Sequence, residues 1–221
     1  MFRIKICGVT NLDDALAAAD AGADAIGFNF CTRSPRFIEP LAARDIAARL
    51  PAGVARVGVF VNSPTGAIVA AAEQVGLDLI QLHGDEPPEE VLALAPRKVM
   101  RAIRAATKNL AEVSRYLERC RRAGAELTAV LADAAVAGQY GGTGERADWE
   151  AWSQYASKPR VPPLVLAGGL VAENVAEGIA LVRPAAVDVA SGVESEPGLK
   201  DHAKVKRFVA AARAAFESIE S

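Results

Sequence analysis

The strongest constraint on the fold of this chain is a strict alternation of two kinds of segment along its length. Short apolar runs rich in β-branched residues, typical of buried strands, begin near Arg3, Ala25, Ala55, Leu77, Lys98, Glu126, Pro163 and Ala186. Between them lie stretches with the helical spacing of apolar residues, such as residues 12–20, 41–50, 65–75 and 110–122, and a final one at 200–216. Alternation of this kind predicts parallel strands joined by crossover helices.

Eight such units within 221 residues predict an α/β protein of one type, a (β/α)8 TIM barrel in which residues 1–221 form a single catalytic domain. A doubly wound open sheet is the competing architecture, but it usually needs fewer strands. No linker or low-complexity segment divides the chain. A glycine two residues before an acid recurs at Gly22, Gly76 and Gly124, where we expect left-handed helix ends that act as structural punctuation.

Composition narrows the classes of partner. The formal net charge is −2 and 24% of residues are charged, so nothing indicates nucleic acid or an anionic membrane as a partner. No stretch approaches the ~18 apolar residues of a membrane span, and the alternating N-terminus does not resemble a signal peptide. The three cysteines, Cys7, Cys31 and Cys120, form no C-x-x-C pair, which favours a reducing compartment. We therefore expect a cytoplasmic enzyme.

The chemistry of such a barrel lies where its strands end. The first strand ends at Cys7, and alternation puts Lys5 and Cys7 on one face. Because barrel strands are buried on both faces, Lys5 must find a partner or reach the pocket. A nearby cation would lower the pKa of the Cys7 thiol, and the resulting thiolate could act as a general base. The alternative is a small buried apolar cysteine.

Two further strand ends carry polar side chains. The loop after the second strand contains Arg33 and Arg36, and an arginine fork there suits a carboxylate, although either residue could belong to a solvated loop. Gln81 and His83 share one face at the end of the fourth strand. His83 could bind or orient a substrate, or could be a hydrogen-bonded structural histidine.

The last strand ends indicate an acid and an anion site. Asp133 closes an apolar sixth strand, where partial burial would let a carboxyl donate a proton. A glycine-rich loop at 138–144 follows and could close over a ligand or be a plain turn. The seventh and eighth strands run into Gly168 and Gly169 and into Ser191 and Gly192. Exposed backbone N–H groups after these two strands are typical of a barrel phosphate site.

Together these blocks resemble the phosphoribosylanthranilate isomerase family of tryptophan biosynthesis. The resemblance covers nearly the whole chain in order, and its blocks are residues 5–10 (KICGVT), 34–36 (SPR), 81–84 (QLHG), Asp133, 139–144 (QYGGTG), 166–170 (LAGGL) and 188–194 (DVASGVE). The first, sixth and eighth strands carry the most specific combination. Residues 29–33 (NFCTR) depart from the expected apolar-to-basic pattern, which bears on contacts of the second loop and not on the reaction.

The resemblance implies an Amadori rearrangement of N-(5-phosphoribosyl)anthranilate, in which an aminoaldose becomes an aminoketose without a cofactor or a metal. It implies Asp133 as general acid and Cys7 as general base, and Arg36 as the residue that holds the anthranilate carboxylate. The backbone at Gly168, Gly169, Ser191 and Gly192 would hold the phosphate, and Gln81, His83 and Asp188 would line the ribose. The only partner expected is this small phosphorylated substrate, and a monomer and a homodimer fit equally well.

Three other functions remain open. The histidine-pathway phosphoribosyl isomerase runs the same rearrangement, but it is expected to have an aspartate where Cys7 stands. Indole-glycerol-phosphate synthase would require a catalytic lysine and glutamate at strand ends. A non-catalytic barrel that binds a phosphosugar would need neither Cys7 nor Asp133.

Overall fold

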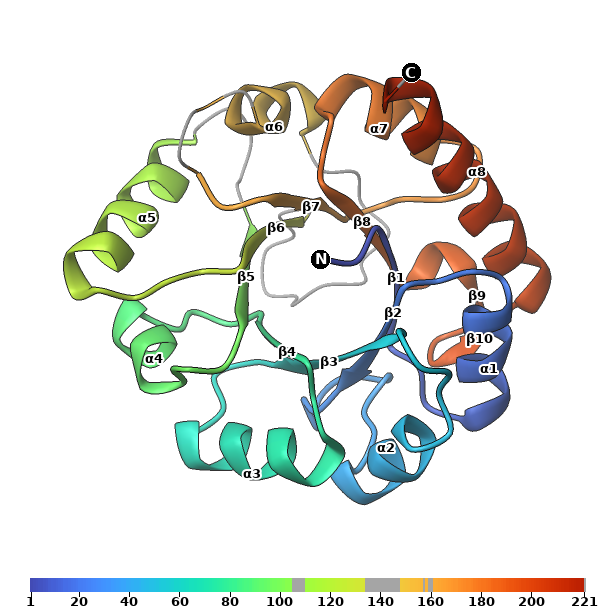
Figure 1. The fold of residues 1–221 in the computed structure, drawn as a ribbon, viewed down its shortest axis with the longest axis horizontal. Coiled ribbons are helices and arrows are strands. Elements are labelled where there is room, and N and C mark those ends of the chain that lie inside the picture. The colour runs from blue at the N-terminus through green and yellow to red at the C-terminus, as the bar shows by residue number, and fades with distance from the viewer. Residues whose placement is uncertain (105–109, 134–147, 157, 159–160, 221) are drawn as a thin grey trace.

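The computed structural model describes residues 1–104, 110–133, 148–156, 158 and 161–220. Its eight parallel strands close into a barrel in the order β1 to β8, and the helices surround the barrel (Figure 1). This confirms the (β/α)8 prediction and rules out an open sheet. The strands are β1 Ile4–Cys7, β2 Ala25–Asn29, β3 Ala55–Phe60, β4 Leu79–Leu82, β5 Val99–Arg104, β6 Ala129–Asp133, β7 Leu164–Leu166 and β8 Ala186–Val189.

The helices follow the strands one by one around the ring. They are α1 Leu12–Asp20, α2 Pro40–Ala47, α3 Thr65–Val75, α4 Pro88–Ala93, α5 Ala111–Ala123, α6 Trp149–Ala156, α7 Val175–Val182 and α8 His202–Glu220. The bounds of α1 and α3 match the expected ranges. None of the helices in the described part of the chain is both long enough and apolar enough to cross a lipid bilayer.

A short hairpin separates β8 from α8. After the 3-10 turn η1 (Ser191–Val193), the strands β9 (Glu194–Glu196) and β10 (Leu199–Lys200) pair antiparallel. The predicted start of the last helix at residue 200 is therefore wrong, because Lys200 belongs to β10. The helix begins at His202, where Asp201 Oδ1 accepts the N–H groups of Ala203 and Lys204 and ends the hairpin as a helix cap.

The interior of the barrel is filled by small and medium apolar side chains that alternate with residues facing the helices. Phe2 belongs to this cluster, and the N-terminus lies in the middle of the ring in Figure 1. The inner cluster consists of Phe2, Ala25, Val57, Leu79, Met100, Ala102, Ala129, Leu131, Val165, Ala167 and Ala186. The opposite faces of the strands pack against the helices.

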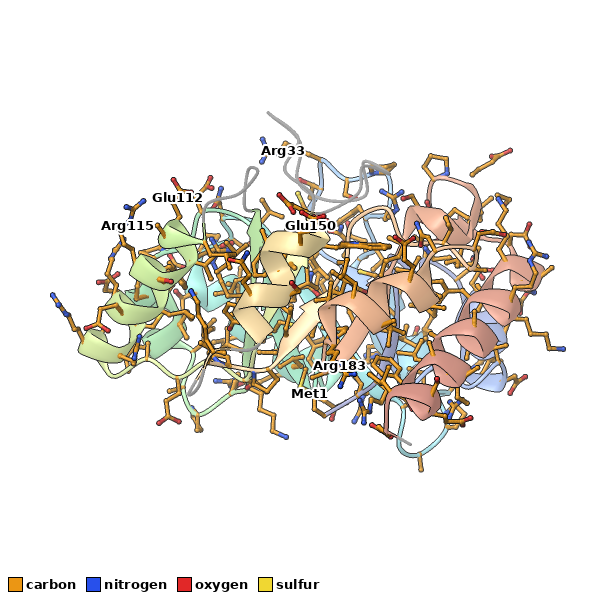
Figure 2. The ribbon with its side chains drawn as sticks, turned by 90° about the horizontal axis from the view of Figure 1, so that it is seen from above. Met1, Arg33, Glu112, Arg115, Glu150 and Arg183 are labelled. Carbon is orange, nitrogen blue, oxygen red and sulfur yellow. The ribbon has the colours of Figure 1, made fainter. Side chains whose placement is uncertain are left out.

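The two ends of the barrel have different roles. Figure 2 shows Met1 and Arg183 at one end and Arg33, which follows β2, at the other. At the Met1 end, Asp24 accepts the N–H of Ile4 and Asp78 accepts that of Arg56, so the recurring acids fasten neighbouring strands. The helix-ending glycines have positive φ as predicted, at Gly22, Gly76 and Gly124. The carboxyl ends of the strands open at the Arg33 end.

Candidate active site

Alternation along the strands places five predicted site residues inside the barrel at this end. Counting by two from interior residues of the same strand, from Leu79 in β4, Leu131 in β6 and Ala186 in β8, gives inward positions for the polar residues that follow. These positions are Gln81, His83, Asp133 and Asp188, and Cys7 lies with Lys5 on the inward face of β1. The sequence therefore brings the two expected catalytic residues to one end of one barrel.

Lys5 finds the partner that its burial requires. Its Nζ lies 2.9 Å from Oδ1 of Asp188, and its side chain is fully buried. Burial alone would lower the pKa of Lys5, but the charge of Asp188 outweighs it, so the pKa is raised and the ammonium is retained. Asp188, which is expected at the ribose, holds a buried cation inside the barrel.

The thiol of Cys7 does not behave as the sequence suggested. Burial raises the pKa of Cys7 above its usual value, and the opposing effect of Lys5 is not sufficient to reverse this. The expectation of a net lowered pKa is therefore wrong, although Lys5 does act in the expected direction. The physical reason is that burial disfavours the charged thiolate by more than Lys5 favours it, and the negative charge of Asp188 adds to the effect of burial.

The absence of a side chain at Gly27 in the neighbouring strand leaves space for the side chains of Lys5 and Cys7. A Cβ atom at Gly27 of β2 would lie 2.8 Å from Sγ of Cys7 and 3.0 Å from Cε of Lys5. Real Cβ atoms essentially never come within 3.0 Å of a heavy atom, so a side chain at this position would have to push the thiol aside. Gly27 therefore sets the lateral position of the sulfur.

On the opposite side of the barrel, a chain of hydrogen bonds links Gln81, His83 and Asp133. His83 Nε2 lies 2.9 Å from Oδ2 of Asp133, and His83 Nδ1 lies 3.0 Å from Nε2 of Gln81. An amide N–H of Gln81 can only donate, so Nδ1 accepts and Nε2 carries the proton directed at the carboxyl of Asp133. His83 is therefore hydrogen-bonded on both ring nitrogens, as expected of a structural histidine, and its bond to Asp133 links it to the predicted general acid. A role in binding or orienting the substrate stays a prediction.

Arg36 lies in a buried cluster of charges formed by the second loop and the hairpin. Its Nε and Nη2 donate to Oε1 and Oε2 of Glu194 at 2.8 and 2.7 Å, and Lys200 Nζ lies 2.7 Å from Oε1. Burial would raise the pKa of Glu194, but Arg36 and Lys200 hold it below its usual value. Two cations around one carboxylate give this cluster a net charge of +1. The interpretation of Arg36 as part of a solvated loop is wrong.

The loops after β7 and β8 lie against each other. Gly168 and Gly169 have φ of +78° and +64°, and a Cβ at Gly192 would lie 1.9 Å from the carbonyl oxygen of Leu170. Asn174 stiffens the first loop, donating to the carbonyl of Gly169 at 2.9 Å. In the described part of the chain, the N–H groups of Gly168, Gly169 and Ser191 have no acceptor. Close glycine loops with unsatisfied N–H groups suit an anion.

Sequence reasoning assigned no role to Glu194 or Lys200. Glu194 ends a quoted motif block, but nothing in the sequence alone says that it pairs with Arg36 158 residues earlier. A lysine between Leu199 and Asp201 gives no signal of burial. The glycine-rich loop at 138–144 lies outside the described residues.

The chain was compared with known proteins. Residues 4–211 match the model of a family described as N-(5'phosphoribosyl)anthranilate (PRA) isomerase. The chain belongs to this family. The N-(5'-phosphoribosyl)anthranilate isomerase of Geobacter sp. (strain M21) is 46% identical over 214 residues, which cover 96% of this chain and 98% of the relative.

Solved structures agree. A crystal structure of phosphoribosyl anthranilate isomerase in complex with reduced 1-(o-carboxyphenylamino)-1-deoxyribulose 5-phosphate matches with a TM-score of 0.81 and 41% identity, over 97% of this chain and all of that one. A structure of monomers generated from the dimeric isomerase of Thermotoga maritima matches with a TM-score of 0.82 and 41% identity, over the same shares. The family confirms the expected enzyme, an isomerase of N-(5'-phosphoribosyl)anthranilate in tryptophan biosynthesis.

Proposed function

We propose that Cys7 and Asp133 carry out the two proton transfers of this isomerisation as general base and general acid. The observation that supports this most directly is their common placement. Each is the last residue of its strand, at an inward-facing position at the same end of the barrel, and each lies beside a buried polar side chain. Cys7 has Lys5 beside it, and Asp133 has His83. Pure binding of a phosphosugar requires neither a thiol nor a carboxyl at these positions.

The acid acts first. The carboxyl of Asp133 donates its proton to the ribose ring oxygen while the nitrogen lone pair forms a C=N bond, and the bond from C1 to the ring oxygen breaks. The products are an open-chain iminium ion and an ionised Asp133. His83, 2.9 Å from Asp133, donates a hydrogen bond that stabilises this carboxylate.

The base acts second. Cys7 takes the proton from C2, and the electrons of the C–H bond form a C1=C2 double bond and neutralise the iminium nitrogen. The resulting enolamine tautomerises to the aminoketose. Because burial raises the pKa of Cys7, the thiolate must be stabilised by nearby positive charge. The iminium charge next to the thiol and the ammonium of Lys5 both favour the thiolate at the stage when it is needed.

Charges at both ends of the substrate fix its position between these groups. The +1 cluster of Arg36, Glu194 and Lys200 suits the anthranilate carboxylate, and the loops with Gly168, Gly169, Ser191 and Gly192 suit the phosphate. Gln81, His83 and Asp188 line the ribose between them. Two fixed ends turn binding energy into orientation of the reacting carbon.

Assembly and location complete the proposal. The isomerase of Thermotoga maritima is described as dimeric, and we propose that this chain is a monomer or a homodimer whose barrel contains a complete site. Three free cysteines, none paired, suit the reducing cytoplasm. The proposed steps use side chains alone, and we expect no requirement for a metal or a cofactor.

The test is steady-state turnover of phosphoribosylanthranilate alongside the histidine-pathway substrate, with Asp133→Asn and Cys7→Ser compared with the unaltered protein. We expect turnover of the first substrate, and a loss of at least a hundredfold in kcat for each variant with the melting temperature kept within a few degrees. Near-normal turnover by either variant would remove that residue from the mechanism. Turnover of the histidine-pathway substrate alone would overturn the proposed function.

A further inference from the structure

The proposed mechanism leaves one buried ion pair without a role. Arg101 in β5 and Glu86 in the loop after β4 lie 3.0 Å apart, Nη1 to Oε2, and their side chains are 8% and 1% exposed. The neighbours of Arg101 in β5, Met100 and Ala102, face the barrel interior, so Arg101 points outward toward the helices. Its guanidinium carbon lies 5.4 Å from the centre of the Tyr116 ring of α5.

The hydrogen bonds of this pair converge on the backbone around His83. Arg101 Nη1 donates to the carbonyl of Leu82 at 3.1 Å, and Nη2 donates to that of Gly84 at 2.8 Å. Arg101 thus holds the residue before and the residue after His83. Glu86 accepts the N–H of Gly84 at 2.9 Å.

The same carboxylate ties this loop to the neighbouring strand. Glu86 Oε1 accepts the N–H of Asn62, two residues beyond β3, at 2.8 Å, and Asn62 Oδ1 accepts the N–H of Asp85 at 2.7 Å. His83 N–H itself donates to the carbonyl of Phe60 at 2.8 Å. Hydrogen bonds therefore hold the carbonyls of Leu82 and Gly84 and the N–H groups of His83, Gly84 and Asp85 in this segment.

Stability alone is a weak reason for such an arrangement. Two buried charges cost desolvation, and apolar side chains of similar volume often stabilise a fold at least as well. Arg101 Nε also has no hydrogen-bond partner among the described residues, so the guanidinium is not fully satisfied. What the pair provides and apolar residues could not is a fixed position for the carbonyls on both sides of His83.

We propose that Arg101 and Glu86 are positioning residues for the reaction, acting through His83 on Asp133. They lie on the outer side of the strands and do not face the barrel interior, so they touch no reacting atom. They fix the backbone from which the His83 ring reaches Asp133 at 2.9 Å. The inference rests on the proposed role of Asp133 as general acid. A shift of about 1 Å in such a group costs catalysis about a hundredfold.

The experiment compares Arg101→Met, Arg101→Lys and Glu86→Gln with Val209→Ala, a buried apolar truncation in α8 that lies remote from the site and controls for lost stability. We expect Arg101→Met to lower kcat at least tenfold and to leave KM within about threefold, because binding groups stay in place. Arg101→Lys should recover part of kcat, since one ammonium can reach one carbonyl. Val209→Ala should lower the melting temperature and leave kcat unchanged.

A double-mutant cycle with His83→Gln separates positioning from general destabilisation. If Arg101 acts through His83, the double variant should be no slower than His83→Gln alone. Additive losses in kcat, or an unchanged kcat in Arg101→Met and Glu86→Gln, would overturn the inference. Glu86→Gln preserves shape and keeps the test decisive if Arg101→Met does not fold. If the Asp133→Asn variant keeps normal kcat, the proposed function fails instead. If that variant loses kcat, the cycle tests the positioning role alone.

Discussion

Arg36 and Glu194 form a buried bidentate pair in which Nε and Nη2 of the guanidinium meet the two carboxylate oxygens at 2.8 and 2.7 Å. The pair uses one edge of the guanidinium fork. Nη1 makes no hydrogen bond to any residue that the structure describes. Glu194 therefore fixes the plane of the guanidinium and leaves its other edge for the carboxylate that we propose Arg36 binds.

Arg36→Ala should weaken binding of the aromatic acid, with KM raised at least tenfold and kcat changed less, because the guanidinium is proposed to hold a carboxylate remote from the reacting carbon. Steady-state kinetics check this, with fluorescence titration of a carboxylate-bearing product analogue as a second measure. An unaltered KM would argue against the carboxylate site.

Glu194→Gln separates two effects of this carboxylate on substrate binding: the orientation of the Arg36 guanidinium and the net charge of the cluster. Loss of the negative charge changes the cluster with Lys200 from +1 to +2, and Coulomb attraction alone would then tighten binding of an anionic substrate. Loss of the fixed guanidinium plane would loosen it. We expect orientation to dominate, so that KM rises at least about tenfold, since a hydrogen bond to a charged group contributes about 1.5–3 kcal/mol and about 1.4 kcal/mol is tenfold. A lower KM would show that Glu194 only limits the charge.

Gly27→Ala should impair catalysis by displacing the sulfur. The new methyl would lie 2.8 Å from Sγ of Cys7 and 3.1 Å from its Cα, so strand and thiol must shift. We expect kcat to fall at least tenfold and stability to fall by about 1–3 kcal/mol, as for other overpacked cores. Gly66→Ala in α3 is the matched control, because nothing lies within 4 Å of its new methyl. That change should stabilise the protein by about 0.5–1 kcal/mol and leave turnover unchanged.

The periodic spacing of apolar residues in the sequence predicts the fold, but it does not predict which charged side chains pair. Alternating strands and helices fix which residues face the barrel interior, and for that reason the sequence predicts the inward placement of Cys7, His83 and Asp133. Partners far apart in the chain are decided by tertiary packing. The sequence predicts that Lys5 needs a partner, but nothing local selects Asp188, 183 residues later.

The predicted direction of the Cys7 pKa is wrong for a related reason. The sequence puts a cation two residues from the thiol, but it does not reveal how deeply tertiary packing buries the sulfur or that Asp188 lies nearby. The helical spacing of its neighbours likewise predicts that Lys200 begins a helix. Its pairing with Glu194 in a hairpin depends on a contact that no local pattern encodes.

Lys5→Met should damage both stability and catalysis, and a second substitution should separate the two. Loss of the ammonium leaves Asp188 charged and buried beside a methyl group, which costs about 3–5 kcal/mol. In Lys5→Met with Asp188→Asn the uncompensated charge is gone, and we expect most of that stability to return. Turnover should remain low in the double variant, because no buried cation remains next to the thiol to favour thiolate. Urea denaturation and kcat measure the two effects, and restored turnover would mean that Lys5 is only structural.

The pH dependence of kcat/KM reports the protonation of essential groups in the free enzyme. In the proposed mechanism thiolate is the active form of Cys7, and burial raises the pKa of this thiol above the usual 9.0. Activity through this group should therefore rise with pH, roughly tenfold for each unit, until the raised pKa is reached. Cys7→Ser should abolish this limb and most of the turnover, since a hydroxyl is a far weaker base at these pH values. Cys7→Asp should retain some turnover with its limb moved to much lower pH, because an aspartate ordinarily titrates near about 3.9. A limb of the unaltered enzyme well below 9 that stays in place in Cys7→Asp would assign the base to another residue.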